Sequence, residues 1–89
     1  ASDPEPLVRV RAAEYLALIG KADPQPIFAD ALDKSTSPIE ANLILNSAVM
    51  LRDGRTHSKF DFSDFRKSET MKGYKNHRYV NDRLNYIAD

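Results

Sequence analysis

The chain has 89 residues and no cysteine, and its 13 basic side chains balance 13 acidic ones, so the formal net charge is zero. This composition excludes a disulfide framework and a thiolate metal site, and it provides no overall field that would draw the chain to nucleic acid or to an acidic membrane. An apolar content of 42% is enough for the core of one small domain, and no apolar run approaches the roughly 20 residues of a membrane-spanning helix.

The first predicted element is a helix that starts near residue 4 and ends before Gly20. Asp3 is a suitable N-cap, and proline at position 4 is tolerated because N–H groups in the first turn have no intrahelical partner. Four apolar residues at helical spacing form one stripe, which we predict to be the most central one: Val8, Ala12, Leu16 and Ile19. Further apolar residues widen it so far that the helix needs neighbours on more than one side: Leu7, Val10, Ala13, Tyr15 and Leu18.

Two further helices are predicted at 24–34 and 38–52. Asp23 begins a second Asp-Pro-x-Pro start, and Ser37 precedes a proline and then Glu40, which completes a capping box. Gly54 follows the third helix, where a stop is expected. Because the connections are short, the first two helices should form an antiparallel hairpin and the third should begin the next layer.

An internal repeat supports this layered arrangement. An offset of 32 residues, from Pro6 to Pro38, superposes the apolar positions of the first and third helices: Leu7 on Ile39, Ala12 on Ile44, Ala13 on Leu45, Leu16 on Ala48 and Ile19 on Leu51. The match loosens at Val8, which falls on Glu40, so a shift of one residue is left open. We divide the single domain 1–89 into a first repeat 3–34, a second, degenerate repeat 37–70 and a terminal helix 76–88.

The segment 55–75 is polar and reads as a long loop that holds one short helix. Its aromatic residues should attach it to the helices, with Phe62 and Phe65 three apart on one face of a turn. The terminal helix then presents an apolar stripe of Val80, Leu84 and Ile87, with Asn76 as its expected cap. The predicted fold class is therefore all-α, with a long loop before the last helix.

A basic second half is the feature that most suggests binding. Residues 51–89 hold nine basic and six acidic side chains, whereas residues 1–50 hold four and seven. Interleaved with aromatic rings, the basic residues form a candidate polyanion-binding surface, with four of them as the site residues: Lys72, Lys75, Arg78 and Arg83. A solvated face, or a surface that docks on an acidic part of a larger protein, is the alternative and favoured interpretation, and nucleic acid is a disfavoured partner.

No catalytic, cofactor or metal site is predicted. His57 and His77 are isolated from any nucleophile and orienting acid, and surface histidines are the favoured interpretation. The acidic residues Asp61, Asp64 and Glu69 do not have the spacing of a calcium-binding loop. Arg9 and Arg11 are interpreted as members of structural ion pairs rather than as anion contacts.

The run from Pro6 to Gly20 resembles the first helix of the short bacterial HEAT repeats, with proline, Val-Arg, Ala-Ala, Leu and Gly at the spacing of that family. Residues 26–32 resemble the second helix of such a repeat, and residues 38–52 resemble the next unit more weakly. The resemblance implies a short HEAT-like α-α superhelix, in which helical hairpins stack in layers.

A wider string resembles the helical tail that follows the catalytic domain in some bacterial sulfatases. It runs from the Asp-Pro repeat through Ala41-Asn42-Leu43-Ile44-Leu45-Asn46-Ser47-Ala48 to Tyr79-Val80-Asn81-Asp82-Arg83-Leu84-Asn85-Tyr86-Ile87. This implies a parent enzyme that hydrolyses sulfate esters with a calcium ion and a formylglycine made in a Cys/Ser-x-Pro-x-Arg motif. The nearest string here, residues 2–6, has proline where the arginine belongs, so the catalytic residues of that family transfer to no position.

The leading hypothesis is thus a non-catalytic, C-terminal structural module of an arylsulfatase-type hydrolase, whose partner is the catalytic domain of its own polypeptide. The start at Ala1, without Met and directly before a helix signal, is expected to be a cut through that longer polypeptide. The resemblance would place the parent in the periplasm or outside the cell. The alternatives are a HEAT-type adaptor that binds another protein and a polyanion-binding module.

Overall fold

The computed structural model describes residues 6–21, 23–54 and 59–88, and over these ranges the chain is helical with no strand. The helices of the described residues are α1 (Pro6–Leu18), α2 (Gln25–Asp33), α3 (Pro38–Asp53), α4 (Ser63–Arg66), α5 (Glu69–Lys72) and α6 (Arg78–Ala88). The prediction of an all-α chain is confirmed. The radius of gyration is 12.1 Å, which is the value of about 12 Å expected for a compact chain of this length.

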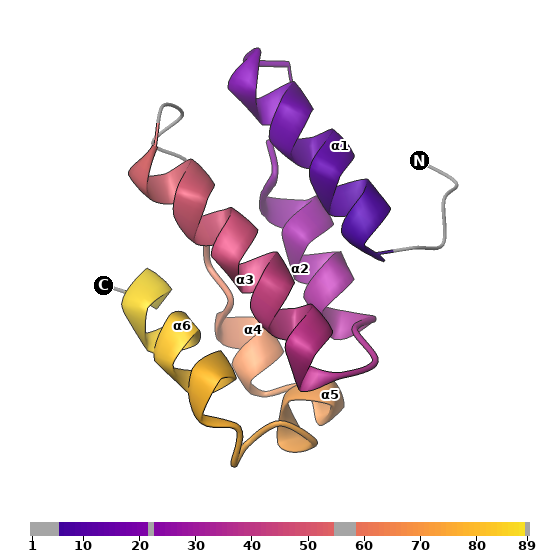
Figure 1. Cartoon of the computed structure of the whole chain (residues 1–89), viewed down its shortest axis with the longest axis vertical. Helices are drawn as coiled ribbons and strands as arrows, with labels where there is room; N and C mark the ends of the chain where they lie inside the picture. The colour runs from indigo at the N-terminus through magenta and orange to yellow at the C-terminus, as the bar shows by residue number, and fades with distance from the viewer. Residues whose placement is uncertain (1–5, 22, 55–58, 89) are drawn as a thin grey trace.

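The helices lie in two rows. Figure 1 shows α1, α3 and α6 side by side and running in the same direction, with α3 in the middle, and α2, α4 and α5 behind them. The packing agrees with the picture, since α3 contacts both α1 and α6, while α2 contacts α1, α3, α4 and α5. The predicted hairpin of α1 and α2 is therefore present, and α3 follows it in the front row.

The predicted start and stop residues largely set the helix ends. Gly20 has a φ of +73°, and bonds from Gly20 N–H to the Ala17 carbonyl and from Lys21 N–H to the Leu16 carbonyl close a Schellman motif after α1. Ser37 caps α3 by accepting from Glu40 N–H, and Glu40 Oε1 accepts from Thr36 N–H. Gly54 follows α3 where a stop was expected. The expected start of the first helix near residue 4 lies outside the described residues.

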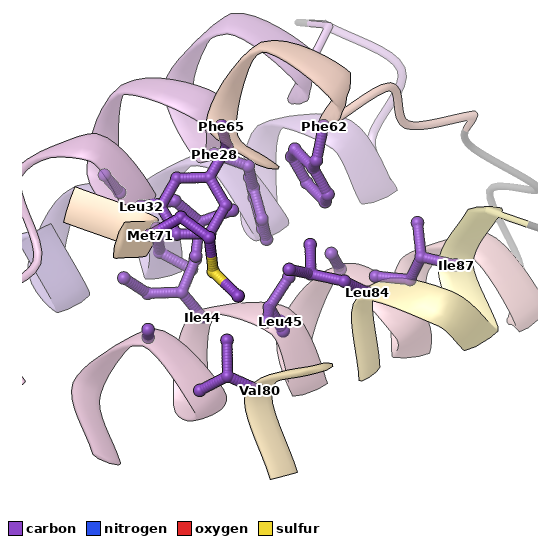
Figure 2. Close-up of a cluster of buried hydrophobic side chains, with 14 of the residues drawn as sticks. Phe28, Leu32, Ile44, Leu45, Phe62, Phe65, Met71, Val80, Leu84 and Ile87 are labelled. Atoms are coloured by element: carbon purple, nitrogen blue, oxygen red, sulfur yellow. The ribbon is translucent and has the colours of Figure 1, made fainter. Parts of the chain in front are cut away.

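The core fills the space between the two rows. Figure 2 shows side chains of α2, α3, α6 and the segment 62–71 converging in one cluster. Its fully buried large residues include Phe28, Leu32, Ile44, Leu45 and Leu84. The predicted stripe of α6 is confirmed, because Val80, Leu84 and Ile87 are all buried.

The predicted core stripe of α1 is wrong. α1 buries Val10, Ala13 and Ala17 instead, while Val8 remains 47% exposed, Leu16 36% and Ile19 49%. The small side chains at 13 and 17 allow a close approach to the α1 backbone, and Val8, Leu16 and Ile19 lie on the opposite side.

The segment before the last helix contains two short helices, α4 and α5, rather than the one that was predicted. Its aromatic residues do attach it to the core, with Phe62 5% and Phe65 4% exposed. Phe60 packs between Phe28 and Phe62, at ring-centroid distances of 5.2 and 5.5 Å. Asn76 is not the cap of the last helix, because α6 begins at Arg78.

Candidate functional site

Two of the four predicted polyanion-binding residues line the same hollow. Lys72 and Lys75 line a hollow of about 180 Å³ together with Arg66, Met71 and Asn81. Arg83 is two residues from Asn81, about 200° round an ideal helix, so it lies on the opposite flank of α6. The structure thus brings Lys72 and Lys75 together with Arg66 and separates Arg83 from them.

Acidic neighbours reduce the net positive charge of the surface around these residues. Lys72 Nζ lies 3.0 Å from Glu69 Oε1, and Arg78 Nε lies 3.7 Å from Asp82 Oδ2. Arg66 donates to Asn85 Oδ1 at 3.0 Å, whereas Lys75 makes no ion pair with the described residues. Such exposed pairs contribute little to stability, but they dilute the field that a polyanion would meet.

A larger uncovered surface lies on α1. We call it the outer face of α1, and it consists of four residues of α1 on the side away from the core and of Ile19 directly after the helix: Val8, Ala12, Tyr15, Leu16 and Ile19. Tyr15 is the most accessible of the large ones, at 63% exposure. Scattered exposed apolar residues are normal in proteins, but a contiguous patch on one helix indicates an interaction surface.

Two hollows lie beside α1, and one of them includes residues of the outer face. One, of about 450 Å³, lies between α1 and α2 and is lined mainly by apolar residues with charged groups at its rim: Arg9, Ala12, Ala13, Leu16, Pro26, Ile27, Asp30 and Lys34. The other, of about 230 Å³, lies between α1 and α3: its lining residues are Leu7, Val10, Arg11, Glu14, Leu43, Ser47 and Met50. The apolar surface therefore continues from α1 toward α2, whereas the hollow toward α3 contains no residue of the outer face.

The predicted structural role of Arg9 is supported by an ion pair inside the first hairpin. Arg9 Nη2 lies 3.4 Å from Asp30 Oδ2, and Lys34 Nζ lies 3.2 Å from the same oxygen. The side chain of Arg9 is only 13% exposed, and its buried Nε has no hydrogen-bond partner in the described part of the chain. Arg11, in contrast, is exposed and forms no ion pair with the described residues.

A polar cluster joins the ends of α3 and α6. Arg52 donates to the backbone carbonyls of Tyr86 and Ile87 at 2.8 and 3.0 Å, and its guanidinium lies 4.5 Å from the centre of the Tyr86 ring. It thereby satisfies carbonyls that a helix end leaves unpaired. The hydroxyl of Tyr86 donates to Asp53 Oδ2 at 2.7 Å, and Arg52 Nε donates to Asp53 Oδ1 at 2.9 Å.

These hydrogen bonds shift the ionisation of the cluster. The bond from Tyr86, followed by the bond from Arg52, lowers the pKa of Asp53 below its ordinary value of 3.8. The same bond to Asp53 raises the pKa of Tyr86 above 10.0, and the bond to Asp53 raises the pKa of Arg52. The cluster therefore favours ionised Asp53 and protonated Tyr86, which suits a structural connection between two helices.

The weighed catalytic candidates form no catalytic arrangement in the described residues. His77 contacts the ring of Tyr79 at a centroid distance of 6.1 Å, and its Nδ1 has no partner there; His57 lies outside the described residues. Asp61 accepts hydrogen bonds from the N–H and hydroxyl of Ser63, which lower its pKa.

Among residues 6–21, 23–54 and 59–88, no group of three or more His or acidic residues is placed to hold a metal. Within the same ranges, no helix is long and apolar enough to span a membrane.

The sequence did not indicate the outer face of α1 as a candidate interaction surface, because its apolar residues were assigned to the core. The internal repeat carried the signal that could have found it. Under the offset of 32 residues, Leu16 corresponds to Ala48 and Tyr15 to Ser47, so at these two positions α1 has the larger side chain. Comparisons with models of known families, with curated proteins and with solved structures found no match to this chain.

Proposed function

We propose that this chain is a non-catalytic HEAT-like packing module, which attaches to a larger protein through the outer face of α1. The observation that carries the proposal is the contiguous apolar surface of that face, which the described helices leave uncovered. Covering a half-exposed Leu, Ile or Val side chain contributes on the order of 1 kcal/mol, so a partner helix gains several such contributions at once.

The larger protein is, in this proposal, a sulfatase-type hydrolase of sulfate esters. The support is the resemblance of the Asp-Pro starts, the Ala41 to Ala48 run and the Tyr79 to Ile87 run to the helical tail of such enzymes. The catalytic chemistry, including its calcium ion, would belong to the rest of the enzyme. The role of this chain would be to complete the fold of the enzyme and to extend its surface.

The reading frame that contains this chain tests the identity of the parent. We expect it to encode a Cys/Ser-x-Pro-x-Arg motif, and the whole protein should hydrolyse an aryl sulfate while the 89-residue chain does not. A frame without the motif would contradict a sulfatase parent.

Replacement of Tyr15 tests the packing role independently of the chemistry. Tyr15→Glu should leave the melting temperature of the 89-residue chain within about 2 °C, because this side chain is 63% exposed and such surface changes are usually nearly neutral. In the whole protein the same change would place a charge in an apolar interface and should lower the melting temperature or the soluble yield.

Tyr79→Glu is the matched control, since Tyr79 is 67% exposed on α6, away from this face. It should be silent in both chains. An equally silent Tyr15→Glu in the whole protein would remove the packing role.

Polyanion binding is the second candidate, and the hollow formed by Arg66, Lys72 and Lys75 favours it. If sulfated glycans bind there, retention on heparin should fall steeply with salt and should be lost when Lys72 and Lys75 are both changed to Ala. Arg83→Ala, on the other flank of α6, should have a smaller effect. Retention that does not depend on salt, or that survives the double change, would exclude this candidate.

A further inference from the structure

We infer that the outer face of α1 is a stacking surface for another helical hairpin, whose first helix presents the same side chains that α1 presents to α3. This inference deepens the proposed function and rests on its claim that the face is covered by a partner. It identifies the partner as a hairpin of the kind already present in this chain, in place of a strand, a loop or a membrane surface.

The internal repeat provides the first argument. Ala12, Leu16 and Ile19 on the outer face correspond, at the offset of 32 residues, to Ile44, Ala48 and Leu51 of α3. In α3, which has α1 beside it, those three residues are 0%, 0% and 5% exposed. The equivalent positions of α1 have no neighbouring helix in the described chain, and the position of Leu16 is therefore 36% exposed instead of buried.

The arrangement of the rows provides the second argument. The parallel helices α1, α3 and α6 follow one another in the front row, and α1 is its end member (Figure 1). Val8, Ala12 and Leu16 form a ridge with a spacing of four residues and a small side chain in the middle, a shape that helices use to pack on each other. Stacked repeats bury such surfaces against the next repeat.

The hollow between α1 and α2 favours a hairpin over a single helix. Ala12 and Leu16 come from α1 and Pro26 and Ile27 from α2, so the apolar lining spans both rows. A first helix on the outer face of α1 would leave the exposed Pro26 and half-buried Ile27 beside it uncovered. A second helix connected to the first would cover them.

Charge supplies an independent feature of the partner. In the α1–α3 hollow, Glu14 of α1 lies with Leu43 and Ser47 of α3. The residues of α1 that correspond to those two are Arg11 and Tyr15. A stacked helix with an acidic residue equivalent to Glu14 would thus place its carboxylate near Arg11, which has no ion pair among the described residues.

The test extends the full chain by one further copy of residues 6–37, placed directly ahead of residue 6, so that Ser37 of the copy precedes Pro6 as Ser37 precedes Pro38. The sequence has no cysteine, and Ala12→Cys in the original repeat therefore introduces a single thiol at the centre of the outer face. We expect a thiol reagent to label this position at least tenfold more slowly in the extended chain, and the extended chain to gain helix by circular dichroism.

Met50→Cys, at a position that is 74% exposed on α3, is the control and should be labelled at the same rate in both chains. Arg11→Glu should lower the melting temperature of the extended chain more than that of the 89-residue chain, and Glu14→Arg in the added copy should restore part of the loss. Equal labelling at position 12 in the two chains, with or without added helix, would overturn the inference.

This outcome is separable from the proposed function. If the extended chain fails the labelling test but Tyr15→Glu still destabilises the whole protein, the face is covered by something other than a stacked hairpin. If the extension succeeds and the reading frame lacks the sulfatase motif, the stacking surface stands and the sulfatase parent does not.

Discussion

Leu45 of α3 and Leu16 of α1 should contribute differently to stability, because their side chains differ in burial. Leu45 is fully buried in the core cluster, whereas Leu16 is 36% exposed on the outer face of α1. Leu45→Ala should destabilise the chain by about 2–5 kcal/mol, because it removes buried methyl groups and leaves a cavity.

Leu16→Ala should cost clearly less, and urea denaturation followed by circular dichroism measures both values. A cost at Leu16 equal to that at Leu45 would mean that the outer face is part of the core of the isolated chain.

For single residues, the sequence predicted the buried positions correctly where a helix has one narrow apolar stripe between polar residues. Val80, Leu84 and Ile87 were identified because polar residues surround them, and Phe62 and Phe65 because they are isolated apolar residues in a polar segment. α1 offers apolar residues on all sides, so periodicity could not decide which side was central. Val10, Ala13 and Ala17 are the residues that α1 buries in the structure, and Ala12, which is as small as Ala13, remains exposed.

Between elements, the cluster of Arg52, Asp53 and Tyr86 makes the connection of α3 to α6 sensitive to pH. Because the pKa of Asp53 is lowered, its contribution to stability is present above about pH 4 and is lost as the pH falls through the folded-state value. Because the pKa of Tyr86 is raised above 10.0, its contribution is present below about pH 10 and is lost as the pH rises through the folded-state value.

Tyr86→Phe should therefore flatten the loss of stability in both the acidic and the alkaline range, relative to Tyr79→Phe as a control. Melting temperatures measured from pH 2 to pH 11 test this expectation. Parallel profiles for the two variants would show that the cluster does not contribute to folding.

The helices themselves were predictable where local chemistry specifies their ends. The capping serine, the prolines and Gly20 gave the end of α1 and both ends of α2 and α3 to within a few residues, because these groups act on adjacent backbone atoms. α4 and α5 have four residues each, too few for a periodic pattern. Ser68 caps α5 by accepting from Met71 N–H, but a serine in a polar segment is a weak sequence signal.

On the scale of the whole molecule, Tyr74 ties the second half of the chain to the first. Its hydroxyl donates to the Ser35 carbonyl at 3.0 Å and lies 3.1 Å from Ser35 Oγ, and the ring is 8% exposed. Tyr74→Phe keeps the ring but removes the hydroxyl that donates to the Ser35 carbonyl. Because this carbonyl then lacks that donor in a buried position, the change should destabilise the chain by about 1–3 kcal/mol.

Tyr79→Phe removes a hydroxyl from a ring that is 67% exposed and should be nearly neutral. Unfolding in urea again gives both free energies. A neutral Tyr74→Phe would indicate that water replaces the lost bond and that the contact is more open than described.

The candidate basic site could be predicted only in part, because the sequence does not show how α5 and α6 are placed relative to each other. Net charge along the sequence identified the second half as basic, but it could not show that Glu69 pairs with Lys72 or that Arg83 lies apart from Lys75. Those facts depend on how α5 and α6 are placed relative to each other, which is set by the core and not by the charged residues.

The side chain of Gln25 makes a reciprocal pair of hydrogen bonds with the backbone of Asp61, at 2.7 and 2.8 Å. These two residues are 36 positions apart, and the Tyr74–Ser35 and Arg52–Tyr86 contacts close loops of similar length. Closing such loops costs chain entropy before the contacts reward it. Folding should therefore begin with the hairpin of α1 and α2 and with α3, and the second half should join them late, so that the basic residues of 66–78 reach their final positions last.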